Sequence, residues 1–229
     1  MFLPLHDGVA LKFLRAPYAT YAIIAANALV FMAMSAGAFG DVDRIDLALG
    51  VTPAVLLGNA ELARALVLVP APTTLVTSAF LHASPLHLVG NMLFLWVFGD
   101  NVEDAMGTLR FLAFYLLCAV AAGLAYSFML PQSDGPLIGA SGAVSGVVAA
   151  YLMLYPRVQV FGLVFSFLPL RIPAILCVGL WVATQVGSAL FGGDAEVGWW
   201  AHVGGLAAGA ALTPLMKRAD VSLFSRQVG

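Results

Sequence analysis

Six long apolar stretches alternate with short polar segments along the chain, and this pattern predicts a bundle of membrane-spanning helices. A helix that crosses the hydrocarbon core of a bilayer needs about 20 mostly apolar residues, with a range of about 17–25. The second and fourth stretches are short by this measure, and short spans are tolerated where other helices surround them in place of lipid. The expected spans are residues 18–39, 84–100, 109–130, 138–155, 172–191 and 199–216.

The basic residues indicate which way the spans point. Six spans place both ends of the chain on the same side of the membrane, and inner loops carry an excess of Lys and Arg. With both ends inside, the outer segments hold only Arg44 and Arg64. The pattern therefore predicts an N-in/C-in topology. The remaining basic residues then lie in inner segments: Lys12, Arg15, Arg110, Arg157, Arg171, Lys217, Arg218 and Arg226.

Composition supports the bilayer as the solvent of this chain. Of the 229 residues, 62% are hydrophobic and 10% are charged, against about 45–50% and about 25% in soluble domains. The net charge of −2 gives no reason to expect a nucleic-acid partner. Cys118 and Cys177 lie within apolar runs without further ligands nearby, so neither a disulfide framework nor a metal site is expected, and no cofactor is implied.

The fold class expected from this pattern is an all-α membrane protein with three parts. Residues 1–17 form an inner N-terminal segment, residues 18–216 the six-helix membrane domain, and residues 217–229 an inner tail. The short tails favour the cell (inner) membrane of a bacterium as the location. The stretch from Gly40 to about Leu81 holds two apolar pieces too short to span, which are expected to lie in the outer interface.

A few polar side chains fall inside the expected spans, where polar groups are costly and usually functional. His87 lies about three residues into the second span, and Asn91 is one turn deeper on the same face. Ser141 lies about four residues into the fourth span, and His202 about three residues into the sixth. All three spans run inward in the N-in topology. At about 1.5 Å per residue, the four side chains therefore share one layer of the outer half.

This set of side chains fits the chemistry of acyl transfer. A serine hydroxyl becomes a nucleophile when a base takes its proton, and histidine is the usual base near neutral pH. The developing oxyanion also needs hydrogen-bond donors, which the Asn91 amide, the His87 imidazole and the Ser141 backbone N–H can supply. No acidic residue of the expected spans lies at this depth. We therefore expect a dyad of Ser141 and His202 in place of a triad.

Glycines are spaced so that two of these helices can pack closely. Gly142 and Gly146 lie four residues apart on the fourth span, and Gly205 and Gly209 repeat the spacing on the sixth. Small residues at this spacing let two helix backbones approach one another. If the two faces meet, the serine and the histidine come within hydrogen-bond reach.

Three motifs resemble the signature of the rhomboid intramembrane proteases. They are LHASPLHLVGNM at residues 81–92, GASG at residues 139–142, and AHVGG at residues 201–205, followed by Gly209. Each motif is short, but all three occur in the order, spacing and topology of that family. The resemblance covers residues 73–210 and implies a six-helix rhomboid fold with a water-filled cavity open to the outside. It also implies substrates that are transmembrane proteins, whose partly unwound helices enter the cavity from the lipid bilayer.

The resemblance assigns a role to each site residue. Ser141 matches the nucleophile, His202 the general base, and His87 with Asn91 the oxyanion site. These are the roles that the residue chemistry suggests independently.

Further positions match or depart from the family pattern. Gly139 matches the glycine that precedes the serine, and His82 matches a structural histidine. Glu103 matches an inner-side acidic residue, which we interpret as a packing or capping partner. Thr73-Thr74 stands where the family often has Trp-Arg, and Ser145 stands where an aromatic residue often stacks on the catalytic histidine.

Simpler interpretations remain open for several of these residues. A serine in a membrane helix interface is commonly a packing residue, and His87 with Asn91 can form a purely structural link between helices. Gln185 in the fifth span is expected to hydrogen-bond between helices, with a place at the substrate entrance as the alternative. For the whole chain, the alternatives are a non-catalytic rhomboid-like protein that binds membrane segments, and a transporter, although no buried acidic or basic residue is expected that could couple an ion.

Overall fold

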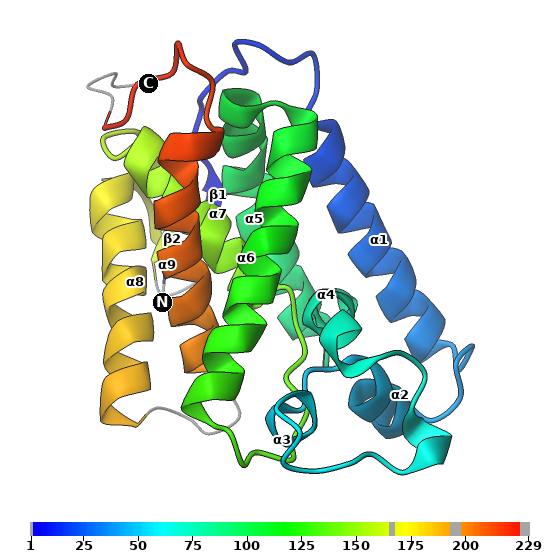
Figure 1. Ribbon diagram of the computed structural model, residues 1–229. Coiled ribbons are helices and arrows are strands. Elements are labelled where there is room, and N and C mark those ends of the chain that lie inside the picture. Colours follow the sequence, from blue (N-terminus) through cyan, green and yellow to red (C-terminus); the bar gives the residue numbers. More distant parts are fainter. Residues whose placement is uncertain (1, 165–167, 193–197, 225–229) are drawn as a thin grey trace.

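The computed structural model describes residues 2–164, 168–192 and 198–224, and most of them are helical (Figure 1). Long helices occupy each of the six stretches in which a span is expected. They are α1 (Tyr18–Ser35), α5 (Pro85–Met106), α6 (Thr108–Met129), α7 (Ser141–Leu154), α8 (Ala174–Phe191) and α9 (Trp199–Met216). Shorter pieces fill the segment between α1 and α5: α2 (Val42–Leu49), α3 (Pro53–Leu56), α4 (Thr74–Thr77) and the 3-10 turns η1 (Arg64–Leu66), η2 (Ala71–Thr73) and η3 (Ser78–Phe80).

The fold is mostly helical, as expected, but it also contains a small antiparallel sheet of three strands that the expectation of an all-α fold did not include. β1 (Phe2–His6) pairs with β2 (Gln159–Val164), and β2 pairs with β3 (Leu168–Pro173). The sheet joins the N-terminal segment to the connection between α7 and α8. Pairing between segments so far apart leaves no signal in the apolar pattern, which reports on local structure. The fifth helix begins at Ala174 and not at residue 172, because the residues before it form β3 and pair with β2.

Length and hydropathy identify some of the long helices as membrane spans. Among the described residues, α1, α6 and α8 each qualify, and a fourth candidate is the pair formed by residues 64–80 and α5, which is bent by 83°. The helix α7 is apolar but has only 14 residues. The chain is therefore a mostly helical membrane bundle with three or four candidate spans by this measure.

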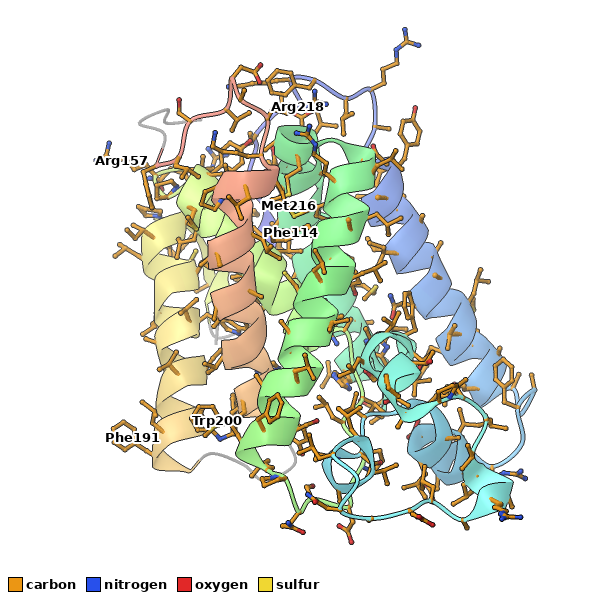
Figure 2. The ribbon with its side chains drawn as sticks, in the orientation of Figure 1. Phe114, Arg157, Phe191, Trp200, Met216 and Arg218 are labelled. Carbon is orange, nitrogen blue, oxygen red and sulfur yellow. The ribbon has the colours of Figure 1, made fainter. Side chains whose placement is uncertain are left out.

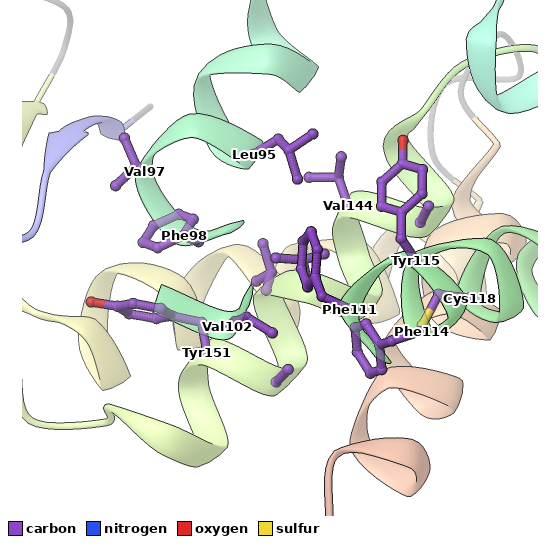
Figure 3. Packing of buried hydrophobic residues seen from close by; sticks show 14 of the residues in the cluster. Leu95, Val97, Phe98, Val102, Phe111, Phe114, Tyr115, Cys118, Val144 and Tyr151 are labelled. Atoms are coloured by element: carbon purple, nitrogen blue, oxygen red, sulfur yellow. The ribbon is translucent and has the colours of Figure 1, made fainter. Parts of the chain in front are cut away.

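The hydrophobic core lies where α5, α6 and α7 meet (Figure 3). Phe98 of α5, Phe111 and Phe114 of α6, and Tyr151 of α7 are all fully buried, and the ring centroids of Phe98 and Tyr151 lie 4.7 Å apart. Eleven of the 14 residues of α7 are buried. Protein therefore surrounds this short helix, which is the condition under which a short span is tolerated.

The inner end of α5 carries buried acidic residues and continues past the expected end of the second span. Glu103 accepts hydrogen bonds from the backbone N–H groups of Ala19 and Thr20, at 3.0 and 2.8 Å, and so caps the start of α1. Asp104 accepts three backbone N–H groups from residues 12–14 at 2.7–2.8 Å. The apolar pattern stops at these acidic residues. The helix α5 nevertheless continues, because backbone N–H groups of the N-terminal segment and of the start of α1 donate hydrogen bonds to the carboxylate oxygens.

Polar and aromatic residues mark the two ends of the bundle. Figure 2 shows Arg157 and Arg218 at the end that carries the C-terminal segment, and Phe191 and Trp200 at the opposite end. This distribution fits the assignment of the basic end to the inner side. Arg226 lies outside the described residues, as do the other residues of 225–229 in the tail.

One part of the segment between α1 and α5 is buried in the protein, and another part is exposed at its surface. Val51 and Ala54 are buried, whereas Val67 and Leu68 are about half exposed. Val51 also forms an isolated antiparallel bridge with Leu137, through N–H···O contacts of 2.8 and 3.0 Å. This bridge anchors the chain just before α7 and so helps to position the start of that helix.

Candidate active site

Ser141 is the first residue of α7, and the backbone before it makes an unusual turn. Gly139 has a φ of +123°, a conformation that favours glycine, and its N–H donates to the carbonyl of Ser78 at 2.9 Å. No side chain among the described residues caps α7. The N–H groups of its first turn, including that of Ser141, therefore remain available as donors at the helix end that favours negative charge.

His202 approaches Ser141 from the first turn of α9. Its Nε2 atom lies 2.8 Å from the Oγ atom of Ser141, which is hydrogen-bond distance. His202 is only 8% exposed, so its imidazole is largely withdrawn from solvent. The structure therefore brings together the two side chains that the sequence singled out as nucleophile and base.

Four glycines hold α7 and α9 close together beside this pair. A Cβ atom on Gly205 would meet the backbone carbonyl of Gly142, and a Cβ atom on Gly209 would meet that of Gly146. The obstructing atoms are backbone, which cannot rotate away as a side chain can. The small-residue spacing in the sequence thus forms the close helix contact that it predicts.

Gln185 of α8 contacts the other side of the His202 ring. Its Oε1 atom lies 2.7 Å from His202 Nδ1, and the side chain is 5% exposed. The expectation of a hydrogen bond between helices is confirmed for Gln185, but its histidine partner was missed. The only signal in the sequence was a polar side chain in an apolar span, and this does not reveal which neighbour it meets.

Aromatic and small residues complete the surroundings of His202. The Trp199 ring lies edge-on to the imidazole with centroids 5.9 Å apart, and the Trp181 ring lies at 6.3 Å. The hydroxyl of Ser145 is engaged within α7, where it donates to the Ser141 carbonyl at 2.7 Å. Tryptophans of α8 and α9 therefore supply aromatic contacts near a histidine that has no aromatic neighbour at position 145.

His87 and Asn91 line the same cavity from the first turns of α5. A Cβ atom on Gly139 would lie 2.7 Å from Cε1 and 2.8 Å from Nε2 of His87, so the imidazole packs directly against this glycine beside Ser141. The Nδ2 atom of Asn91 lies 3.0 Å from His82 Nε2. Burial, with the nearby His87, lowers the pKa of His82 to about 4. A neutral His82 accepts one N–H of the Asn91 amide and leaves the second N–H for another acceptor.

A cavity of about 580 Å³ contains these groups. It holds a hydroxyl nucleophile, a base in contact with it, and several N–H donors, which are the parts that acyl transfer requires. Its polar lining includes Ser141, His202, His87, Asn91 and Gln185, and its apolar lining includes Phe94, Tyr126, Leu137, Trp181 and Trp199.

The fold and this cavity define a class of protein, namely helical membrane proteins that hold a serine–histidine pair in a cavity. Residues 70–219, which are more than half of the chain, match the family model described as Rhomboid domain. The chain belongs to the rhomboid family and is a multi-pass membrane protein. The resemblance stated from the three motifs is thereby confirmed.

Proteins with curated names show the same relationship. Rhomboid protein 1, mitochondrial, of Saccharomyces cerevisiae is 32% identical over 142 residues, which are 58% of this chain and 38% of the yeast protein. RHOMBOID-like protein 12, mitochondrial, of Arabidopsis thaliana is 31% identical over 153 residues, which are 60% of this chain and 44% of the plant protein. Presenilin-associated rhomboid-like protein, mitochondrial, of Homo sapiens is 33% identical over 98 residues, 42% of this chain and 25% of the human protein. The similarity therefore covers less than half of each relative.

Proposed function

We propose that this protein is an intramembrane serine endopeptidase that hydrolyses peptide bonds in or near the transmembrane segments of membrane proteins. The observation that carries the proposal is the 2.8 Å contact between Ser141 Oγ and His202 Nε2 at the wall of the cavity. Membership of the rhomboid family supports the same type of reaction. The proposed steps use no metal and no other cofactor.

The proposed reaction proceeds through an acyl-enzyme. Ser141 Oγ attacks the carbonyl carbon of the scissile bond while His202 Nε2 takes the hydroxyl proton. The oxyanion accepts hydrogen bonds from the Ser141 N–H, the Asn91 amide and the His87 imidazole. His202 then gives its proton to the leaving amine, and the acyl group stays on Ser141. A water molecule that loses its proton to His202 attacks the ester carbonyl. The ester C–O bond then breaks, the second product leaves as its carboxylic acid, and His202 returns the proton to Ser141 Oγ.

The proposed arrangement in the membrane has six spans with both ends inside. Residues 18–216 then form the membrane domain, and the segments 1–17 and 217–229 lie on the inner side. The distribution of basic residues supports this orientation, and the burial of α7 supports its assignment as a short span. The cavity would open to the outer side of a cell (inner) membrane, where water for deacylation is available.

A comparison of serine variants tests the proposal. The purified protein is incubated in detergent and in vesicles with a single-span substrate whose membrane segment is rich in Gly and Ala. Ser141→Ala is expected to abolish cleavage, because it removes the nucleophile, whereas Ser145→Ala, one turn deeper on the same helix, is expected to cleave. Cleavage by Ser141→Ala at the rate of the unchanged protein would contradict the mechanism.

Labelling with a fluorophosphonate probe separates the proposal from the alternative of a non-catalytic membrane-segment-binding protein. The probe reacts with a serine only when a base activates it. We expect labelling of the unchanged protein and none of Ser141→Ala or His202→Ala. A folded protein that never labels would favour the non-catalytic alternative.

A further inference from the structure

We propose that Gln185 is a positioning residue that holds His202 in the tautomer and orientation required of the base. This inference rests on the proposed function, and it adds a third side chain to the expected dyad. The observation behind it is the 2.7 Å contact between Gln185 Oε1 and His202 Nδ1, on the opposite side of the ring from Ser141.

The surroundings of Gln185 fix which end of its amide faces the histidine. Its Nε2 atom donates to the carbonyl of Trp181 at 3.3 Å and to the hydroxyl oxygen of Thr184 at 3.2 Å. The Thr184 hydroxyl in turn donates to the same Trp181 carbonyl at 2.6 Å. An amide nitrogen is a donor only, and a carbonyl oxygen is an acceptor only. With its nitrogen engaged on α8, the amide presents its oxygen to His202.

An acceptor at Nδ1 determines the proton positions on the imidazole. Because Gln185 Oε1 can only accept, His202 Nδ1 carries the hydrogen, and in the neutral ring Nε2 is then the unprotonated nitrogen. An unprotonated Nε2 is the form that accepts the proton of Ser141 Oγ. The opposite tautomer would present an N–H to the serine and leave the reaction without a base. Gln185 thus selects the productive form by a single hydrogen bond.

Among the described residues that line the cavity, Gln185 is the one that contacts His202 Nδ1. No Asp or Glu is among the described residues that line the cavity, so the position opposite Nε2 is held by a neutral amide and not by a carboxylate. Gln185 is also buried on a helix whose other buried described residues are Ala174, Cys177 and Val178. A buried amide without partners is costly, and here all its hydrogen bonds contribute to one defined orientation.

Substitutions at Gln185 test this inference. In Gln185→Leu the Nδ1–H loses its acceptor, and we expect kcat to fall about tenfold or more, since misorientation forfeits part of the roughly 10²- to 10⁴-fold gain from general base catalysis. KM should remain nearly unchanged. The acid limb of the pH–rate profile should move to lower pH, because the protonated imidazole loses a hydrogen-bond acceptor. Gln185→Glu keeps an acceptor oxygen at the same place and is expected to recover most of the lost rate.

Two controls keep the result interpretable. Ser188→Ala removes a polar group from the same helix at a position that does not line the cavity, and it should keep the kcat and the pH profile of the unchanged protein. If Gln185→Leu fails to fold, as judged by its thermal transition in detergent, Gln185→Met takes its place, because it keeps the length of the side chain.

The outcomes distinguish this inference from the proposed function. A failure of the unchanged protein to cleave, or cleavage by Ser141→Ala, would refute the proposed function itself. If Ser141→Ala is inactive but Gln185→Leu has the kcat and pH profile of the unchanged protein, the serine mechanism stands and the positioning role is overturned. A lowered kcat, a shifted acid limb and recovery by Gln185→Glu together support the role.

Discussion

The hydroxyl of Tyr151 donates a hydrogen bond of 2.7 Å to the carboxylate of Asp7, and this contact ties the N-terminal segment to α7. Asp7 follows directly after β1, and the same carboxylate oxygen accepts the amide of Asn101 at 2.9 Å. The N-terminal segment is therefore attached to α7 by this side-chain contact, and to the connection after α7 by the sheet.

Tyr151→Phe is expected to destabilise the protein by about 1–3 kcal/mol, because the partly buried Asp7 carboxylate loses a donor. Burial raises the pKa of Asp7 above 3.8, and the Tyr151 hydrogen bond opposes that rise. A raised carboxyl pKa means that stability falls as the pH rises from 3.8 through the folded-state pKa. The loss in Tyr151→Phe should therefore be larger at about pH 8 than at about pH 4. Thermal unfolding in detergent at both pH values measures it.

Tyr155→Phe serves as the control for this prediction. Its hydroxyl makes only a long contact of 3.5 Å with the Asn101 carbonyl, so the loss should be small. If both variants lose the same stability at both pH values, the hydrogen bond from Tyr151 to Asp7 contributes no more to stability than the long Tyr155 contact.

Glu103→Ala is expected to loosen the start of α1. The carboxylate of Glu103 is fully buried and accepts the backbone N–H groups of Ala19 and Thr20 together with the hydroxyls of Thr20 and Thr108. Its removal leaves these buried donors unpaired, at a cost of about 3 kcal/mol or more. A lower thermal midpoint and faster proteolysis of the N-terminal segment would be observed, whereas exposed Glu61→Ala should change neither.

Gly205→Ala is expected to separate α9 from α7. The added methyl group has no space, because it meets the backbone carbonyl of Gly142, and overpacking of this kind costs about 1–3 kcal/mol. The separation should also weaken the contact between Ser141 and His202 and so slow fluorophosphonate labelling. Gly187→Ala on α8 is the matched control, since its added methyl group meets nothing within 4 Å. Equal labelling rates in the two variants would argue against the close helix contact.

Gly139→Ala is expected to reduce cleavage about 100-fold or more, which is the scale of losing an oxyanion donor. A side chain at this position meets His87, and the φ of +123° is unfavourable for alanine. Both effects disturb the turn before Ser141, so kcat should fall while the helical content measured by circular dichroism is retained. The exposed Gly135→Ala, which meets nothing within 4 Å, should remain as active as the unchanged protein.

The apolar pattern predicted the helices well because it reports directly on local structure. The sixth expected span coincides with α9, Trp199–Met216, at both ends. Polar residues are so few in these spans that Ser141 and His202 could be selected before their distance was known. Glu103 was interpreted as a packing or capping partner, and the structure shows it as a cap of α1.

Features that depend on distant parts of the chain were not predictable in the same way. The pairing of β1 with β2 joins the N-terminus to a connection near residue 160, and neither strand carries enough apolar alternation to indicate its partner. Gln185 and His202 meet because α8 lies beside α9, and this depends on tertiary packing. In both cases the sequence shows that a group needs a partner but not which partner it finds.

The length of α7 has a consequence for where a membrane helix can be cut. Fourteen residues extend about 21 Å, whereas the hydrocarbon layer is about 30 Å thick. A helix of this length cannot reach both boundaries, so in the proposed arrangement any shortfall at its outer end places Ser141 below the membrane surface. For a protease built in this way, lengthening α7 by one turn would move the scissile position along the substrate by about 5 Å. Under the proposed function, the length of α7 therefore determines where the substrate is cut, together with the sequence of the substrate.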